Sequence, residues 1–420
     1  MDYRYVIVGG GMTADAAAKA IRRADPTGSV VLISAEADAP YRRPPLSKAL
    51  WNGEDPAKVF LGTEKHGVEM LLSDRSVALD VDSHEVTTAG GKQVRYERLL
   101  LATGVRPRTL PDIPVGGPIF TYRNLADFRE ARRRSGPGNR VLVVGGGFIG
   151  AELAAGLVRA GSEVHMVFRE QAISAMRFPL ELAQAVTADY RARGVKIHAS
   201  NGVASVAVDD DSASVEFIDG AGGKFDLIIV GVGAIPNDEL ASEAGLKVDN
   251  GIVVDEQLRA KSVRGPNGEA MDPVAADVYA AGDVASFPWP RPLARGRIEH
   301  EDNAVTMGAH AGRQMAASFL GQGRAGASSE QQGAAYTHLP FFYSDLFDNG
   351  YEALGILDSR LETVVDWRQP GKEGVVYYLD DGLVVGILLW NTWGQVDEAR
   401  ELLLAARQVD KSDLRGVLPR

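Results

Sequence analysis

The sequence predicts an α/β fold of buried parallel strands, followed by an α+β module near the C-terminus. One pattern, an apolar run followed by a glycine cluster and a small-residue helical stretch, occurs twice, at residues 6–23 and 141–161. Continuous apolar runs such as 30–34 and 226–230 indicate strands that are buried on both faces, as in parallel sheets. Beyond about residue 325, runs that alternate apolar and polar residues and a final helical pattern indicate antiparallel strands capped by a helix.

The two glycine clusters read GGGMTA, at residues 9–14, and GGGFIGAE, at residues 145–152. Each cluster follows a strand and opens a helix, so its backbone can approach a pyrophosphate whose charge the helix N-terminus stabilises. One such motif is weak evidence, but two strand–turn–helix units predict two dinucleotide sites in one chain. The residues alone do not assign which copy holds which dinucleotide.

Composition excludes several classes of protein. The 420 residues include 56 acidic and 45 basic side chains, and the net charge of -11 argues against a nucleic-acid or anionic-membrane binder. The absence of cysteine excludes disulfides, thiolate metal sites and a thiol redox relay. His310 and the other histidines lack partners at ligand spacing, so no metal is expected. Without a signal peptide or a membrane-length apolar run, we expect a cytoplasmic protein.

The remaining elements follow from apolar runs and turn residues. We expect strands at 4–8 and 30–34 with a helix at 12–23 between them, and a hairpin leading into a buried strand over 85–101. Alternating strands are expected over 193–230, and an exposed loop at 262–276 precedes a buried strand at 277–287. A helix at 303–320 and a linker at 321–335 follow.

Two acidic residues stand at the ends of strands that follow the glycine motifs. Glu36 ends the strand after the first motif, and Glu170 ends the strand after the second. An acid at this place accepts hydrogen bonds from ribose hydroxyls, and Glu170 would repel the 2′-phosphate of NADPH. The sequence therefore favours NADH in the second site, although Arg169 and Arg177 leave NADPH as an alternative.

The motifs GGGMTA, YRRPPLSK, LLATG, GGGFIGAE, VGVGAIPN, VYAAGD and RIEHED occur in this order over nearly the whole chain. This set resembles the FAD- and NAD(P)H-dependent oxidoreductases that include oxygenase-type ferredoxin reductases, such as putidaredoxin reductase, and apoptosis-inducing factor. The segments PFFYSDLFDNGYEALG and GVVYYLDDGLVVGILLWN resemble the C-terminal domain of apoptosis-inducing factor in particular.

The resemblance implies a glutathione-reductase-like fold with two dinucleotide-binding domains and a C-terminal domain. It divides the chain into an FAD-binding domain at 1–114 and 243–320, an NAD(P)-binding domain at 115–242 and an α+β domain at 325–420.

The resemblance also implies roles for individual residues. Lys48, Glu152 and His300 are the expected catalytic residues, with Lys48 near the flavin ring and paired with Glu152. Residues of the FAD domain that are expected to contact a cofactor are Gly9, Gly10, Gly11, Met12, Thr13, Ala14, Glu36, Arg43, Val77, Ala102, Thr103, Gly104, Gly282, Asp283, Glu299 and His300. Arg123, in the expected NAD(P) domain, matches a family position that contacts FAD. Those expected at the nicotinamide nucleotide or in the C-terminal domain are Gly145, Gly146, Gly147, Phe148, Ile149, Gly150, Glu152, Glu170, Gly233, Tyr343, Glu352 and Asn391.

Simpler interpretations of some of these residues remain open. Lys48 and Glu152 also fit a surface ion pair worth about 0–1 kcal/mol. His300 also fits a structural role, and Tyr343, where the family has tryptophan, also fits plain core packing.

The activity implied by the resemblance is hydride transfer from NADH to FAD, followed by electron transfer to an acceptor. A ferredoxin-type iron–sulfur protein is the first candidate acceptor, and the run with Arg291, Arg295 and Arg297 is either its docking face or a solvated loop. Quinone, dye or oxygen reduction is an alternative. A redox-sensing flavoprotein that forms a homodimer on reduction is another.

Overall fold

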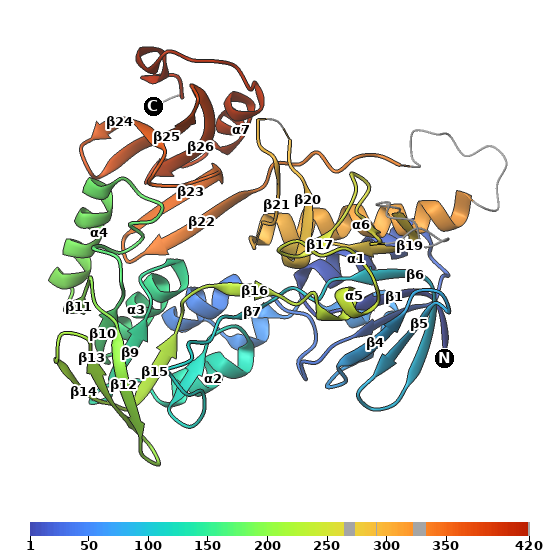
Figure 1. The fold of residues 1–420 in the computed structure, drawn as a ribbon, viewed down its shortest axis with the longest axis horizontal. Coiled ribbons are helices and arrows are strands. Elements are labelled where there is room, and N and C mark those ends of the chain that lie inside the picture. The colour runs from blue at the N-terminus through green and yellow to red at the C-terminus, as the bar shows by residue number, and fades with distance from the viewer. Residues whose placement is uncertain (264–273, 291, 322–332, 419–420) are drawn as a thin grey trace. The chain divides into compact units, whose positions relative to one another are not determined.

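The computed structural model describes residues 1–263, 274–290, 292–321 and 333–418 (Figure 1). The chain divides into two compact units whose segments alternate along the sequence. The first unit contains Met1–Arg42, Val59–Arg106 and Ile235–Pro340. The second unit contains Arg43–Lys58, Pro107–Ala234 and Phe341–Arg420.

This grouping differs from the domains expected from the sequence by a few residues at the boundaries near 107 and 235, and most clearly in one segment. Residues 43–58, expected in the FAD domain, belong to the same compact unit as the expected NAD(P) and C-terminal domains. Residues 322–332 of the expected linker and 264–273 of the expected loop lie outside the described residues. The division into three domains therefore stays a prediction.

The first unit is built on a sheet around β1 (Asp2–Val8), whose last four residues are buried. β1 lies between β2 (Val30–Ile33) and β6 (Gln93–Leu101) and is parallel to both. The strand order is β18-β19-β6-β1-β2-β3, and the β4–β5 hairpin pairs with β6. The other strands of this sheet are β3 (Glu69–Leu71), β4 (Ser76–Asp80), β5 (Glu85–Thr88), β18 (Arg259–Lys261) and β19 (Val274–Ala280).

Helices α1 (Met12–Ala24) and α6 (Glu301–Gly321) lie side by side in this unit (Figure 1). A Cβ added to Gly308 of α6 would lie 2.4 Å from the carbonyl oxygen of Thr13 in α1. Glycine at this position therefore lets the two backbones approach closely. The remaining elements are α5 (Glu239–Glu243), β17 (Ile252–Val253), β20 (Ala285–Pro288), β21 (Arg295–Gly296), and the 3-10 helices η4 (Thr63–His66) and η5 (Gly282–Val284).

The second unit contains a parallel sheet in the order β11-β10-β9-β15-β8, with α3 packed against β9 and β10. Its strands are β8 (Ile119–Thr121), β9 (Arg140–Val144), β10 (Glu163–Val167), β11 (Lys196–His198) and β15 (Leu227–Val230). Its helices are α2 (Leu125–Arg133), α3 (Phe148–Arg159), α4 (Leu180–Ala192) and the short 3-10 turns η1 (Pro44–Ser47) and η2 (Ala49–Asn52).

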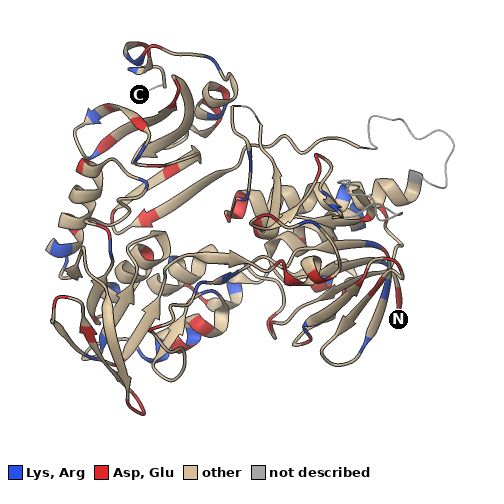
Figure 2. Ribbon diagram, viewed as in Figure 1, with Lys and Arg blue, Asp and Glu red and all other residues tan. Residues whose placement is uncertain are grey.

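Charge is absent from the strand segments that lead to the glycine motifs (Figure 2). β1 and β9 carry charged residues only in their first halves, and β2 and β15 carry none. The uncharged ends are buried, so each motif begins at a rigid part of its sheet. The sequence prediction of an α/β fold with buried parallel strands is confirmed, although the sheet of the first unit also contains antiparallel pairs.

The C-terminal segment of the second unit forms an antiparallel sheet in the order β22-β23-β26-β25-β24, with α7 packed on β23 and β26. Alternation in the sequence indicated antiparallel strands here, and six consecutive residues of β25 are buried. The central strands are therefore covered on both faces. These elements are β22 (Phe341–Leu346), β23 (Asn349–Gly355), β24 (Glu362–Gln369), β25 (Glu373–Asp380), β26 (Leu383–Trp390), α7 (Val396–Leu404) and η6 (Lys411–Leu414).

The second unit also has a small antiparallel sheet of β12 (Val203–Val208), β13 (Ala213–Phe217) and β14 (Gly222–Phe225), and a polar cluster on β10 and β11. The Nδ1 atom of His165 lies 3.2 Å from Nε2 of His198, and its own Nε2 lies 3.0 Å from Oε1 of Glu163. The ring of Phe225 meets that of His165 edge-on.

Two further strands, β7 (Val105–Pro107) and β16 (Ala234–Pro236), pair with each other. In the described part of the chain, no helix is long and apolar enough to cross a membrane.

The histidine cluster predicts how stability depends on pH. Burial lowers the pKa of both His165 and His198 below the ordinary value of 6.5. The unfolded chain therefore binds more protons near pH 6, so the free energy of unfolding should fall as the pH drops from about 7 to about 5.5. Hydrogen bonds from Lys196, His165 and Arg140 lower the pKa of Glu163 to about 2, so its contribution is lost only below about pH 4.5.

Urea unfolding followed by circular dichroism between pH 5.5 and 8 measures this dependence. His165→Gln should reduce the slope of stability against pH, whereas the exposed-site control His66→Gln should keep it. An unchanged slope in His165→Gln would contradict the assignment.

Candidate functional site

The first glycine motif contains a close backbone approach between β1 and β6. A Cβ on Gly9, whose φ is +134°, would lie 2.1 Å from the carbonyl oxygen of Ala102. Gly11 is the N-cap of α1 and supplies no side-chain hydrogen bond. No side chain of the N-cap residue therefore occupies the first N–H groups of α1. Such N–H groups at the start of a helix can bind a phosphate.

Other predicted residues of the first unit surround this helix end. A Cβ on Gly282 would lie 2.2 Å from Oγ1 of Thr13, so the turn that carries the buried Asp283 packs against the start of α1. Thr103 donates a hydrogen bond to the carbonyl of Asn237 at 2.6 Å. The structure thus brings Ala102 to Gly9, and Gly282 to Thr13 at the start of α1.

The outlying predicted residues of the first unit have different surroundings. Glu36 follows β2, and its Oε2 accepts a hydrogen bond from the hydroxyl of Tyr41 at 2.6 Å. The carbonyl of His300 accepts the N–H of Ala304 in the first turn of α6, so His300 stands at the start of that helix. Glu299 pairs with Arg297 at 2.9 Å. Val77 lies in β4 with 47% of its surface exposed, and no described contact supports a binding role for it.

The second glycine motif repeats the close approach with a different neighbour. A Cβ on Gly145, whose φ is +118°, would lie 2.3 Å from the carbonyl oxygen of Gly231. A Cβ on Gly150 would lie 2.2 Å from the carbonyl oxygen of Gly145. Gly147 is the N-cap of α3, and no other atom lies within 4 Å of where its Cβ would be. Among the described residues, no other segment therefore packs against this position.

The other residues predicted for the second dinucleotide site lie at the start of α3 or on the loops after β10 and β15. Phe148 is the first residue of the helix, and the guanidinium carbon of Arg177 lies 4.4 Å from its ring centroid. Ile149 is 44% exposed, and a Cβ on Gly146 would lie 2.8 Å from the ring of Phe168. Glu170 follows β10 and is fixed by a backbone hydrogen bond from Ser200. Gly233, with a φ of +107°, adopts a conformation that favours glycine.

Lys48 and Glu152 form a largely buried ion pair within the second unit. Lys48 Nζ donates a hydrogen bond to Oε1 of Glu152. The two side chains are only 13% and 5% exposed. This burial excludes the interpretation of an ordinary surface ion pair. Burying two charges costs more free energy in desolvation than their attraction returns, unless further hydrogen bonds satisfy them.

Two serines that the sequence analysis did not identify complete this site. Ser47 donates to Oε2 of Glu152 at 2.6 Å, and Ser344 donates to Oε1 at 2.5 Å. Both serines are buried. Their only sequence signal is position, because each is adjacent to a residue that the motifs had singled out, Lys48 in one case and Tyr343 in the other.

The residues of the C-terminal sheet that were predicted to contact a nucleotide differ in whether their side chains are already held by hydrogen bonds. The Nζ atom of Lys48 lies 5.3 Å from the ring centroid of Tyr343, which pairs with Glu352 across β22 and β23. Burial raises the pKa of Glu352, and its Oε2 atom is buried with no hydrogen bond among the described residues. The side chain of Asn391 instead holds the backbone of Gly350 and Lys372, which is a structural role.

Three residues that the resemblance assigns to FAD lie in the second unit. These residues are Arg43, Lys48 and Arg123. Nη1 of Arg43 donates to the carbonyl of Arg123 at 3.0 Å, and the N–H of Arg123 donates to Asp127.

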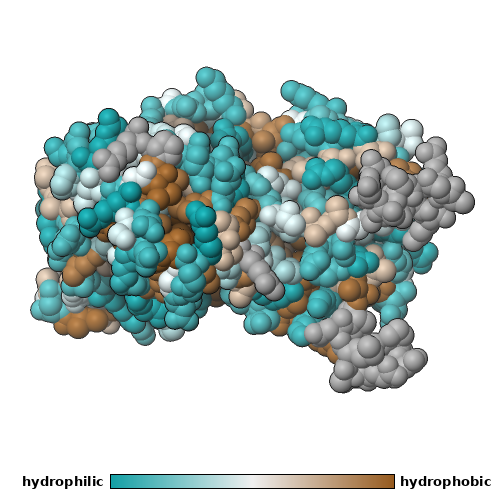
Figure 3. All heavy atoms as spheres, turned by 90° about the horizontal axis from the view of Figure 1, so that it is seen from above, coloured by the Kyte–Doolittle hydropathy of each residue, from teal (hydrophilic) through white to brown (hydrophobic). Residues whose placement is uncertain are grey.

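In the basic run, considered either a docking face or a solvated loop, Arg295 is exposed although both described arginines bond to carbonyls of their own unit. Nη1 of Arg295 donates to the carbonyls of Val254 and Ser286, and Nη1 of Arg297 donates to the carbonyl of Asp283. The side chain of Arg297 is only 9% exposed. Arg291 lies outside the described residues. The face in Figure 3 is hydrophilic over most of its area, with apolar residues in smaller areas.

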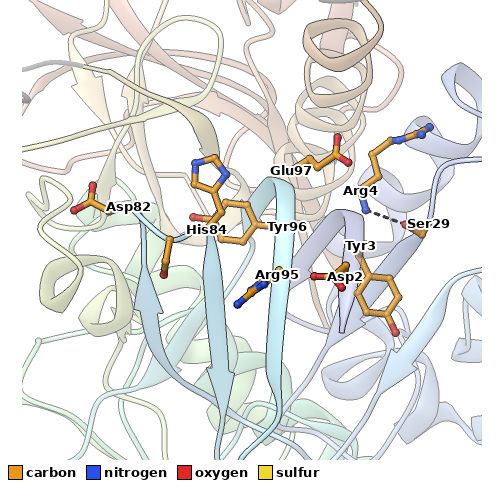
Figure 4. A pocket seen from close by; sticks show the side chains of 10 residues that line it. Asp2, Tyr3, Arg4, Ser29, Asp82, His84, Arg95, Tyr96 and Glu97 are labelled. Carbon is orange, nitrogen blue, oxygen red and sulfur yellow. Dashed lines mark hydrogen bonds between the residues drawn. The ribbon is translucent and has the colours of Figure 1, made fainter.

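A wide groove of about 560 Å³ in the first unit is not part of this site. It is lined at the beginning of β1 by Asp2, Tyr3 and Arg4, whereas the glycine motif follows the end of that strand (Figure 4). The rings of His84 and Tyr96 stack in it at 5.1 Å. Ligands of α/β sheets bind at the carboxyl ends of strands, so this groove lies at the wrong end. Within the described ranges, no three metal-ligating side chains form a cluster.

The structure fits one dinucleotide at each motif. In both units a glycine is the N-cap of a helix of more than ten residues, and no side chain caps that helix. A second glycine, two residues earlier, passes within contact distance of the backbone next to a neighbouring strand. A side chain at Gly9 or Gly145 would collide with the neighbouring backbone carbonyl and shift the turn that leads to the helix end.

Comparisons with known proteins agree with this geometry. The pattern of the pyridine nucleotide-disulphide oxidoreductase family matches residues 3–308, and the chain belongs to this family. The pattern of the C-terminal domain of apoptosis-inducing factor, mitochondrion-associated, matches residues 368–405. The chain has no cysteine, so the disulfide chemistry in the family name has no residue here to perform it.

Two relatives and one solved structure match almost the whole chain. Apoptosis-inducing factor 1, mitochondrial, of Dictyostelium discoideum is 31% identical over 97% of this chain and 79% of its own. The ferredoxin–NAD(+) reductase component of the anthranilate 1,2-dioxygenase system of Burkholderia cepacia is 30% identical over 98% and 96%. The covalent putidaredoxin reductase–putidaredoxin complex matches with a TM-score of 0.84 at 27% identity, over 98% of this chain and 95% of the other.

The chain is therefore an FAD-dependent NAD(P)H oxidoreductase of the glutathione-reductase-like fold. The predicted fold class, the resemblance and the two cofactors are confirmed. The roles of individual residues stay predictions.

The buried ion pair predicts separable effects on stability and activity. Lys48→Ala leaves the carboxylate of Glu152 buried without its cation, so the free energy of unfolding should fall by about 3–5 kcal/mol. The double variant Lys48→Met/Glu152→Leu should recover much of this stability but not NADH oxidation. Urea unfolding and steady-state kinetics measure the two effects. Full activity in the double variant would show that the pair is only structural.

Proposed function

We propose that this protein transfers electrons from NADH, by way of FAD, to a small ferredoxin-type iron–sulfur protein. The observation that carries the proposal is the match over nearly the full length of both chains to the ferredoxin–NAD(+) reductase component of an oxygenase system. The absence of cysteine supports it, because electrons cannot leave through a protein disulfide.

The chain contributes binding, orientation and charge. We assign FAD to the motif at Gly9–Gly11 and NADH to the motif at Gly145–Gly150. FAD, when bound, supplies the hydride acceptor and the capacity to pass electrons on. The N–H groups at the starts of α1 and α3 hold the phosphates, and the backbone close approaches keep these helix ends in place.

Lys48 provides a positive charge in a site with little access to water. Its ammonium favours negative charge that develops at a bound redox group, and a buried charge acts more strongly than an exposed one. Glu152 balances the lysine and holds its direction. We therefore assign Lys48 an electrostatic role and Glu152 an orienting role in the reaction with NADH.

A second candidate function is NADH oxidation with quinone, dye or oxygen as acceptor, in the manner of a protein related to apoptosis-inducing factor. The match of residues 368–405 to the C-terminal domain of that protein favours it. In a variant of this function, the protein acts as a redox sensor that forms a homodimer when NADH is present. A cytoplasmic location stays a prediction.

An acceptor panel distinguishes these functions. The FAD-loaded protein is mixed with NADH and cytochrome c, with and without a [2Fe–2S] ferredoxin. Ferredoxin should raise the rate of cytochrome c reduction by at least about tenfold, because it is the proposed physiological acceptor. Equal rates with and without ferredoxin, together with fast quinone reduction, would favour the second function. Slow turnover with every acceptor and NADH-dependent dimerisation in gel filtration would favour the redox sensor.

Cofactor preference follows from the acid after β10. Glu170 should accept hydrogen bonds from a ribose and repel a 2′-phosphate, so kcat/KM should be at least about tenfold higher for NADH than for NADPH. Glu170→Ala should reduce this ratio, whereas Glu181→Ala, an exposed control in α4, should not. A wild-type preference for NADPH would assign the main recognition to Arg169 or Arg177 instead.

A further inference from the structure

The carboxylate of Glu152 has more hydrogen-bond donors than an ion pair requires. Lys48 and Ser344 both donate to Oε1, and Ser47 donates to Oε2. All three groups act as donors, so Glu152 acts only as an acceptor, as an ionised carboxylate does. A single donor would let the carboxylate turn about its last side-chain bond, whereas donors on both oxygens fix its plane.

The two serines stand on segments that are themselves held in place. Ser47 ends η1, which begins with Pro44. The carbonyl of the preceding residue, Leu46, accepts hydrogen bonds from Tyr122 Oη at 2.5 Å and from Trp51 Nε1 at 2.9 Å. Proline fixes its own φ, and these two bonds fix the peptide that leads into Ser47. The position of the Ser47 hydroxyl is therefore set by three neighbouring side chains.

Ser344 is fixed by the C-terminal sheet. It lies within β22 and pairs with Tyr351 of β23, and only 2% of its surface is exposed. A buried hydroxyl without a partner costs free energy, so the Ser344 hydroxyl strongly prefers its bond to Glu152. A residue of the C-terminal sheet thus sets the direction of a side chain on the helix of the second glycine motif.

We propose that Ser47 and Ser344 are positioning residues for the reaction with NADH. They hold the carboxylate of Glu152, and through it Lys48, in the one orientation that serves the nicotinamide half of the bound dinucleotide. This inference rests on the proposed assignment of NADH to the second glycine motif. It does not depend on the identity of the electron acceptor.

The test compares ligands with and without the nicotinamide. Ser47→Ala and Ser344→Ala are prepared in the FAD-loaded full-length protein, with Ser212→Ala as control, because Ser212 is also buried in the second unit but contacts Asp209 instead. Calorimetry measures the dissociation constants of NAD⁺ and ADP-ribose. Each test variant should bind NAD⁺ about 5- to 10-fold more weakly, the effect of about one lost hydrogen bond, and ADP-ribose within about twofold of wild type. The control should change neither.

Kinetics and a double-mutant cycle separate positioning from a general structural effect. With ferricyanide as acceptor, each serine variant should lower kcat about tenfold while KM for NADH changes less. In a Glu152→Ala background, the same serine substitutions should have no further effect on kcat or on the NAD⁺ to ADP-ribose ratio, because the group that they position is gone. Ser344→Thr, which keeps the hydroxyl, should restore part of the loss.

Three results would overturn the proposal. These are equal weakening of NAD⁺ and ADP-ribose, an undiminished serine effect in the Glu152→Ala background, or wild-type kcat in both serine variants. If Ser344→Ala does not fold, Ser47→Ala alone decides between these outcomes. If ferredoxin fails to stimulate turnover while the NAD⁺ to ADP-ribose ratio still shifts, the assigned acceptor is wrong and the positioning role stands.

Discussion

Where β1 and β9 end, the chain passes so close to the carbonyl that directly follows a neighbouring strand that no side chain fits between them. Gly9 meets Ala102 in this way, and Gly145 meets Gly231. Because the approach is made by backbone atoms, it fixes the direction in which the following helix starts. The helix ends, the acids after the next strands and the packing of α1 against Gly308 all depend on that direction.

The second unit adds to this common arrangement a polar site in its interior. An ionised carboxylate is tolerated there because a lysine and two serines donate to it. The donors come from a loop near residue 47 and a strand near residue 344, and the acceptor comes from α3 between them. The glycine motif alone therefore does not define this site, since Ser344 belongs to the C-terminal sheet.

Features that depend on local backbone conformation were predictable from the sequence. Positions 9 and 145 require glycine because any side chain there would clash with a backbone carbonyl. The glycine motif in the sequence indicates this requirement. Ser47 and Ser344 were not predictable, because a serine hydroxyl forms useful bonds in many places and its partner is about 100 to 200 residues away. The role of the arginines near 295 stayed open for a related reason, because their residue type does not tell whether they face solvent or bond to the carbonyls of their own unit. Burial of β25 on both faces was missed because alternation reports the strand but not what covers it.

The alternation of segments between the two units has a consequence for synthesis of the chain on the ribosome. Lys48 emerges early, but the strand with Ser344 follows almost 300 residues later. At about 5–20 residues per second, Glu152 waits roughly ten seconds or more for its last donor after it has been made. During that time the nascent second unit carries an incompletely paired carboxylate and an open sheet.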